Sequence, residues 1–294
     1  SRAMVDPLHP VDDTPVPVGP SVLGITMAAR ATIVDGWLVR DLEVPEGLDG
    51  PDGILQGGLA AGVTIDAARA ADRFGAPLTA VDARLFAPTP LGRTLQVAVR
   101  PTDTTATYEV ETRDEGRVLV AATVELAGYD PSAQAYDLIE LASAPIPQGR
   151  AESPFPHCFV CGVDPHHEHG QQLLPAWVDE GRISIPWVCD EELGGETGII
   201  DPLVVSAVLD CPTVWSAWHE VEANDWQGAL LAHYHLRMYG DAPVMDPVRT
   251  VARFDGLDGR KIRARGGLVD EDGIVYAISS ALHIGVAELP AASA

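Results

Sequence analysis

One aspartate lies in a strongly apolar setting and is the first candidate for chemistry. Asp210 follows Val208 and Leu209 and precedes Cys211 and Pro212, in a segment that otherwise has the composition of a buried helix. Burying a carboxylate costs free energy unless the group is paired or takes part in a reaction. A functional Asp210 would be a general base that activates water. The structural alternative is a cap for the turn that Pro212 distorts, or a pairing with a histidine.

A second candidate site precedes another apolar helix. Gln56, Gly57 and Gly58 lead into an alanine-rich segment from Leu59 to about Phe74, which leaves only a thin polar stripe. Adjacent glycines permit a sharp turn and the close approach of another backbone. A helix that is apolar on nearly all sides is buried on most of them. We therefore expect this helix to be wrapped by a sheet.

Two further aspartates belong to these helical segments. Asp66 lies on the polar stripe of the first helix, and Arg69 follows three positions later. This spacing fits a surface ion pair, and a catalytic role is the alternative. Asp201 precedes Pro202 at the start of the second helix, which is typical of an N-cap.

A Cys-x-x-Cys pair with histidines downstream has the residue types of a zinc site. Cys158, Cys161, His166 and His169 follow a loose version of the usual ligand spacing. The alternative is a reduced pair of cysteines packed in a glycine-rich loop. We favour that alternative, and expect neither a metal nor a resident cofactor.

The one basic cluster contains the only lysine of the chain. On a strand, Lys261, Arg263 and Arg265 share one face. They form either a phosphate-binding patch or a solvated face paired with surrounding acids. His233 and His235 also alternate onto one strand face, where they either contact substrate or play a structural role, and one of them can pair with Asp210.

Composition excludes several classes of function. The formal net charge of −24 repels nucleic acids and anionic membrane surfaces, so we expect neither as a partner. No run is long and apolar enough to span a membrane, and no basic start precedes an apolar core as in a signal peptide. Four cysteines are too few for a disulfide framework, which favours a cytoplasmic location.

The order of predicted elements occurs twice. A hairpin, a helix and a meander of about four strands are followed by the same series, and the two last hairpins, at 114–121 and 270–277, resemble each other. Gly57 and Pro202, at the two helix starts, lie 145 positions apart. We predict a tandem duplication of one α+β unit. The expected parts are a proline-rich arm at 1–20, a first domain at 21–130, a linker at 131–155 and a second domain at 156–288.

Three motifs carry a resemblance to a known superfamily. Residues 56–61 (QGGLAA) and 84–92 (RLFAPTPLG) resemble the glycine-glycine helix start and the "FLRPxPLG" strand end of double hotdog acyl-CoA thioesterases, including the acyl-CoA thioesterase II type. Residues 157–162 (HCFVCG) resemble the "CFVCG" segment of PaaI-like thioesterases. The resemblance implies two antiparallel sheets, each wrapped around one central helix.

The resemblance also implies a reaction. Its substrate is an acyl-CoA or acyl-carrier thioester, with coenzyme A as part of the substrate, and the amides at the helix start near Gly57 and Gly58 face the thioester carbonyl. Asp210 falls on the position of the catalytic aspartate of related enzymes. Gln56 stands where many relatives have a histidine that orients the thioester. Asp201 lies nine positions before Asp210, which is the interval between histidine and aspartate in other relatives.

Departures from the family pattern leave two alternatives open. The threonine and glutamine that assist the aspartate in relatives have no clear counterparts here. A catalytically inactive binder of acyl-CoA or acyl carriers is therefore one alternative, and a hotdog dehydratase or lyase of a biosynthetic pathway is the other. A homo-oligomer is compatible with each.

Overall fold

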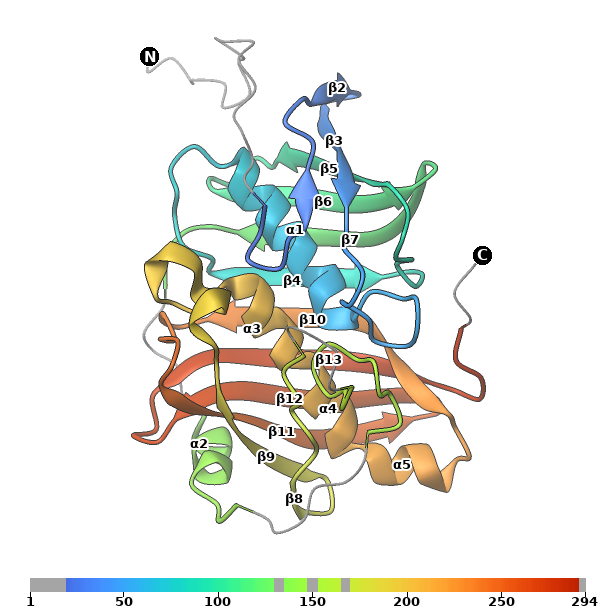
Figure 1. Ribbon diagram of the computed structural model, residues 1–294, viewed down its shortest axis with the longest axis vertical. Helices are drawn as coiled ribbons and strands as arrows, with labels where there is room; N and C mark the ends of the chain where they lie inside the picture. Colours follow the sequence, from blue (N-terminus) through green and yellow to red (C-terminus); the bar gives the residue numbers. More distant parts are fainter. Residues whose placement is uncertain (1–19, 130–134, 147–152, 165–169, 291–294) are drawn as a thin grey trace.

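One antiparallel sheet runs through the molecule. The computed structural model describes residues 20–129, 135–146, 153–164 and 170–290. Within these ranges, thirteen strands form one sheet in the order β1-β3-β5-β6-β7-β4-β10-β13-β12-β11-β9-β8, with β2 paired to β3 (Figure 1). The strands are β1 Thr26–Met27, β2 Thr32–Val34, β3 Trp37–Glu43, β4 Ala80–Leu85, β5 Leu95–Pro101, β6 Thr107–Asp114, β7 Arg117–Glu125, β8 Trp177–Asp179, β9 Arg182–Val188, β10 Gly228–Met238, β11 Pro247–Asp258, β12 Lys261–Asp270 and β13 Val275–Val286.

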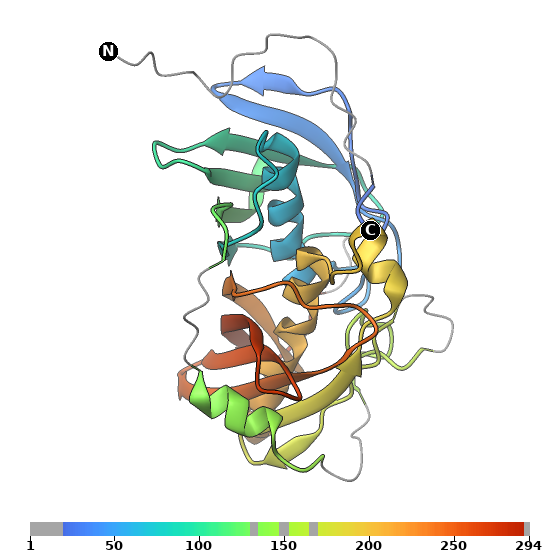
Figure 2. The same cartoon turned by 90° about the vertical axis from the view of Figure 1, so that its left-hand side faces the viewer.

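The middle of the sheet joins the early and late parts of the chain. Strand β4 pairs with β10 in an antiparallel register that aligns Ala83 with Tyr234. Strands β1 to β7 thus lie on one side of this seam, and strands β8 to β13 lie on the other. Figure 2 shows that the helices at 57–71 and 202–216 pack against the same face of the sheet, on either side of the seam.

Helices α1 (Gly57–Ala71) and α3 (Pro202–Val208) meet in the centre of the molecule. Helices α4 (Asp210–Ser216) and α5 (Trp218–Ala223) follow α3 directly in the chain. A short helix α2 (Tyr136–Ala142) and a 3-10 segment η1 (Glu191–Thr197) complete the set within the described residues. No helix in these ranges is both long and apolar enough to cross a membrane.

The predicted second helix is interrupted. The sequence predicts one helix beginning after Asp201, whereas the structure ends α3 at Val208 and starts α4 at Asp210. Pro212 has no amide hydrogen for the carbonyl of Val208, so one helical hydrogen bond is lost at this point. The break occurs directly before the candidate aspartate.

The bounds of the first helix differ from the predicted ones by a few residues. The first helix begins at Gly57 and ends at Ala71, rather than running from Leu59 to about Phe74. Before β1, residues 22–23 form a turn, in which Ser21 Oγ accepts hydrogen bonds from the amides of Leu23 and Ile25.

Glycines let the two central helices touch. A methyl group built on Gly58 would lie 2.3 Å from the carbonyl oxygen of Ser206, and one on Gly62 would lie 2.6 Å from Leu203 Cδ1. Ser206 Oγ in turn donates a 2.7 Å hydrogen bond to the carbonyl of Gly58. Neither Gly57 nor Gly58 has a positive φ. The glycines therefore serve close helix packing rather than an unusual turn conformation.

We predict that Gly58→Ala destabilises the fold, because the added methyl meets backbone rather than a flexible side chain. The free energy of unfolding should fall by about 1–3 kcal/mol, as for other overpacked cores. Urea denaturation measures it. Gly240→Ala is the matched control, since a methyl there would meet only Tyr276 Cδ1 at 3.8 Å. An equal loss in both variants would contradict the packing argument.

Candidate active site

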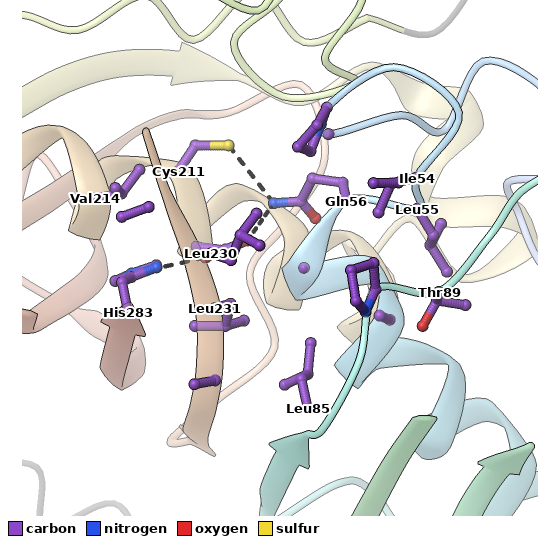
Figure 3. Close-up of a pocket in the computed structure, with 18 of the residues that line it drawn as sticks. Ile54, Leu55, Gln56, Leu85, Thr89, Cys211, Val214, Leu230, Leu231 and His283 are labelled. Atoms are coloured by element: carbon purple, nitrogen blue, oxygen red, sulfur yellow. Dashed lines mark hydrogen bonds and ion pairs between the residues drawn. The ribbon is translucent and has the colours of Figure 1, made fainter. Parts of the chain in front are cut away.

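An apolar cavity of about 250 Å³ lies where α1 begins. Its walls come from the loop before α1, the end of β4, helix α4 and strand β10 (Figure 3). Ile54, Leu85, Val214 and Leu231 are among the apolar side chains that line it. Polar atoms gather on its wall near Gln56, Asp210 and His283. A mainly apolar cavity with a few convergent polar groups is the usual form of a small-molecule site.

The start of α1 holds the carboxylate of Asp210. Its Oδ2 accepts hydrogen bonds from Gln56 Nε2 at 2.7 Å and from the Gly58 amide at 2.9 Å. Gln56 Oε1 accepts the amide of Leu59 at 2.8 Å, so Gln56 is also the N-cap of α1. This cap fixes the orientation of the Gln56 amide, because its oxygen faces Leu59 and its nitrogen must then face Asp210. Asp210, Gln56 and Gly58, all predicted from sequence, are thus brought together.

Burial sets the protonation of Asp210. It raises the pKa of the carboxyl to about 7, against the lowering effect of the Gly58 hydrogen bond. The helix start supplies the partial positive charge that such a buried carboxylate requires. The second oxygen, Oδ1, receives no hydrogen bond from the residues that the structure describes, and His283 Nε2 lies 3.9 Å from it.

His283 was missed by the sequence prediction, which proposed His233 or His235 as the histidine beside Asp210. Thr213 Oγ1 donates to the Asp210 carbonyl at 2.6 Å and lies 2.8 Å from His283 Nε2. Since the hydroxyl proton is used, Nε2 must carry the proton of the imidazole. Burial lowers the pKa of His283 to about 3, so the ring is neutral. The buried face of β13, on which Ser279, Ala281 and His283 alternate, is the signal that could have identified it.

Three cysteines meet at the edge of the cavity. Cys158 and Cys161 come from the loop before β8, and Cys211 follows Asp210 in α4. Their sulfurs lie within 4.8 Å of one another, and all three thiols are free and buried. Cys211 is a partner that the sequence prediction did not include. His166 and His169, the predicted alternative ligands, lie outside the described residues.

Asp66 and Asp201 lie away from this cavity. Both pair with Arg69, at 3.4 Å and 3.1 Å, and line a separate cavity that also reaches Tyr129. Asp201 Oδ1 accepts the amide of Leu203 at 2.9 Å, as the N-cap interpretation requires. Asp201 therefore caps α3, and Asp66 pairs with Arg69 as the spacing predicted, although the Asp66 side chain is only 14% exposed and does not lie at the surface. Neither residue shares a cavity with Asp210.

The remaining candidates also lie outside the cavity. His233 Nε2 lies 2.9 Å from Asp82 Oδ1, and the pKa of half-buried His235 is lowered by burial. Arg265 pairs with Asp255 and Asp137 on the outer surface. Lys261 and Arg263 are exposed on the same strand, and the Arg263 guanidinium is 3.9 Å from Asp258. This arrangement is that of a solvated face paired with acids.

Sequence comparison gives no relative. No known protein family matches the chain, and no curated protein matches it significantly. Solved structures, in contrast, share its architecture over most of its length.

Three of these structures illustrate the likeness. The acyl-CoA thioesterase II TesB2 from Mycobacterium marinum is 11% identical, with a TM-score of 0.60 over 93% of this chain and 98% of its own. A conserved protein with a hot dog fold from Alicyclobacillus acidocaldarius is 12% identical, with a TM-score of 0.55 over 89% of this chain and 97% of its own. The dehydratase domain of a mycocerosic acid synthase-like polyketide synthase is 16% identical, with a TM-score of 0.58 over 93% and 97%.

At these identities the likeness establishes the fold. The chain has the fold of the hotdog thioesterase-like proteins, as the sequence motifs predicted. Thioesterases and dehydratases both occur among the similar structures, so the reaction must be argued from the site.

We predict a pH-dependent stabilisation by Asp66→Asn. Burial and the charge of Asp201 raise the pKa of Asp66 to about 7, from 3.8 for an ordinary aspartate. The raised pKa of Asp66 therefore lowers the free energy of unfolding. This loss grows as pH rises from about 4 to about 7 and is constant above that pH. The advantage of the variant in unfolding free energy should rise by about 2 kcal/mol between pH 5.5 and pH 8.5. Urea denaturation at both values measures it.

The exposed Asp103→Asn is the control for this prediction, because its carboxylate is solvated in both states. An advantage of Asp66→Asn that is constant, or larger at pH 5.5, would contradict the assignment.

Proposed function

We propose that this protein hydrolyses a thioester of coenzyme A or of an acyl carrier, with Asp210 as the general base. The observation that supports it is a buried carboxylate, held by one oxygen at the start of α1, on the wall of an apolar cavity. This arrangement leaves Oδ1 to take a proton from water. The apolar part of the cavity receives the acyl group, and the thiol portion extends toward solvent.

The reaction needs a polarised carbonyl as well as a base. Gly57 lines the cavity, and its amide makes no hydrogen bond with the residues that the structure describes. This amide at the helix start is our candidate for binding the carbonyl oxygen, on which negative charge develops. Absence of a side chain at Gly57 is required, since a methyl there would lie 2.8 Å from Asp210 Oδ2.

The bond changes follow from these positions. Asp210 accepts a proton while the water oxygen bonds to the carbonyl carbon, and the resulting oxyanion faces the Gly57 amide. When the carbon–sulfur bond breaks, the thiolate takes the proton back from Asp210. The products are a carboxylic acid and a free thiol. Thr213 donates to the carbonyl of Asp210 and accepts from neutral His283, whose ring lies beside the Asp210 carboxylate. These contacts position α4.

The proposal includes the origin of the fold. We infer that the chain is a tandem double hotdog, in which α1 and α3–α4 are equivalent central helices. Support comes from the 145-residue spacing of Gly57 and Pro202 and from the pairing of β4 with β10 between the two parts. The cavity volume of about 250 Å³ lies just below the usual range of ligand sites, about 300–1,000 Å³, which favours short acyl groups.

Asp210→Asn tests the proposed base. We expect the rate of thioester hydrolysis, followed by release of free thiol from acyl-CoA substrates of different chain lengths, to fall about 10²- to 10⁴-fold. Asp66→Asn is a matched control, since Asp66 is also a shielded carboxyl with a pKa near 7 but lies in the other cavity. Its activity should equal that of the unchanged protein.

Two outcomes would overturn the proposal. Full activity in Asp210→Asn would remove Asp210 from the role of base. Tight binding of acyl-CoA without thiol release from any substrate would instead favour the inactive binder. Loss of water from a β-hydroxyacyl thioester, detected by mass spectrometry, would favour a dehydratase.

A further inference from the structure

We propose that Cys158, Cys161 and Cys211 form a binding site for a thiolate-preferring divalent metal ion, with zinc as its natural occupant. The sulfurs of Cys158 and Cys211 lie 3.8 Å apart, and all three sulfurs lie within 4.8 Å of one another. Two thiolates at about 2.3 Å from a tetrahedral zinc are about 3.8 Å apart. The three side chains thus occupy positions close to those of zinc ligands. This inference concerns metal binding and does not depend on thioester hydrolysis.

A tight turn carries two of the ligands. The Gly162 amide donates to the Cys158 carbonyl at 2.8 Å. A methyl group on Gly162 would lie 2.4 Å from the Cys158 carbonyl oxygen, so this tight turn requires glycine. The turn directs both cysteine side chains of the Cys-x-x-Cys pair toward helix α4, which supplies Cys211.

Hydrogen-bond donors contact two of the three cysteine sulfurs. Gln56 Nε2 lies 3.6 Å from Cys211 Sγ, and Ser153 Oγ lies 3.5 Å from Cys161 Sγ (Figure 3 shows the contact of Gln56). Donors of this kind stabilise the thiolate form, and groups around metal ligands have the same role.

Three sulfur ligands leave one coordination position of the metal ion, and this position faces the cavity. All three cysteines line the cavity that also holds Asp210, while the rest of each side chain is buried. Three protein ligands and one exchangeable position are typical of zinc sites that bind an external ligand. Water or a thiol, both present at a thioester site, would complete the coordination. The motif prediction had two histidines in place of Cys211, so the folded chain suggests a different ligand set.

Metal titration of the full chain tests the proposal. The reduced, metal-free protein is loaded with Zn²⁺ or Co²⁺, and bound metal is counted by mass spectrometry of metals. We expect one equivalent of either ion, with thiolate-to-Co²⁺ charge-transfer absorption. Cys211→Ser should lower zinc affinity at least about 100-fold, since loss of a direct ligand costs at least as much as loss of a supporting group. Cys189→Ser is the matched control, because Cys189 is a buried free thiol outside the cluster.

A second readout covers variants that fold poorly. In the unchanged protein, Zn²⁺ should protect Cys158, Cys161 and Cys211 from alkylation and leave Cys189 unaffected, as peptide mass spectrometry can show. Thermal unfolding should shift upward with Zn²⁺ in the unchanged protein and in Cys189→Ser only. Three results would overturn the proposal: no bound metal at equimolar Zn²⁺, an unchanged affinity in Cys211→Ser, or a native disulfide between two of the three cysteines.

Discussion

The contact between Asp210 and the start of α1 is the interaction on which the centre of this protein depends. It joins residues more than 150 positions apart, because Asp210 Oδ2 accepts hydrogen bonds from Gln56 and Gly58. A buried carboxylate is costly by itself, and the end of a helix with unsatisfied amides is costly as well. Each compensates for the other here. The break between α3 and α4 places the carboxylate at this end of the helix.

Close helix packing makes this contact possible. Gly58 allows the backbone of α1 to approach Ser206, and Ser206 binds the Gly58 carbonyl in return. Tyr234 of β10 donates from its hydroxyl to the Ser206 carbonyl at 3.0 Å, which ties the seam of the sheet to the same point. These contacts therefore join the sheet, the two helices and the candidate site. A shift of either helix would separate Asp210 from its donors and alter the wall of the cavity.

Two groups of reactive side chains line the small cavity. The carboxylate with its helix amides suits acyl transfer, and the three thiols beside it suit a soft metal ion. Gln56 links them, because its amide nitrogen contacts both Asp210 Oδ2 and Cys211 Sγ. A histidine at this position would change its charge with pH, whereas the glutamine amide donates hydrogen bonds to both groups and stays neutral. This dual contact is a physical reason for glutamine at the start of α1.

The sequence by itself determined the local features. Apolar patterning located α1 and most strands, the glycine pair indicated a close helix contact, and the unusual setting of Asp210 identified a buried acid that the structure places beside Gln56. The folded chain alone decided which residues surround that acid. His283 and Thr213 come from a distant strand and an adjacent helix turn, and Cys211 meets Cys158 only through the loop before β8. Conversely, Asp201 lies only nine positions before Asp210 in the sequence, yet it lines another cavity with Asp66 and Arg69. Spacing along a chain constrains neighbours within one element, but contacts between elements depend on strand register and helix packing, which arise only when the whole chain folds.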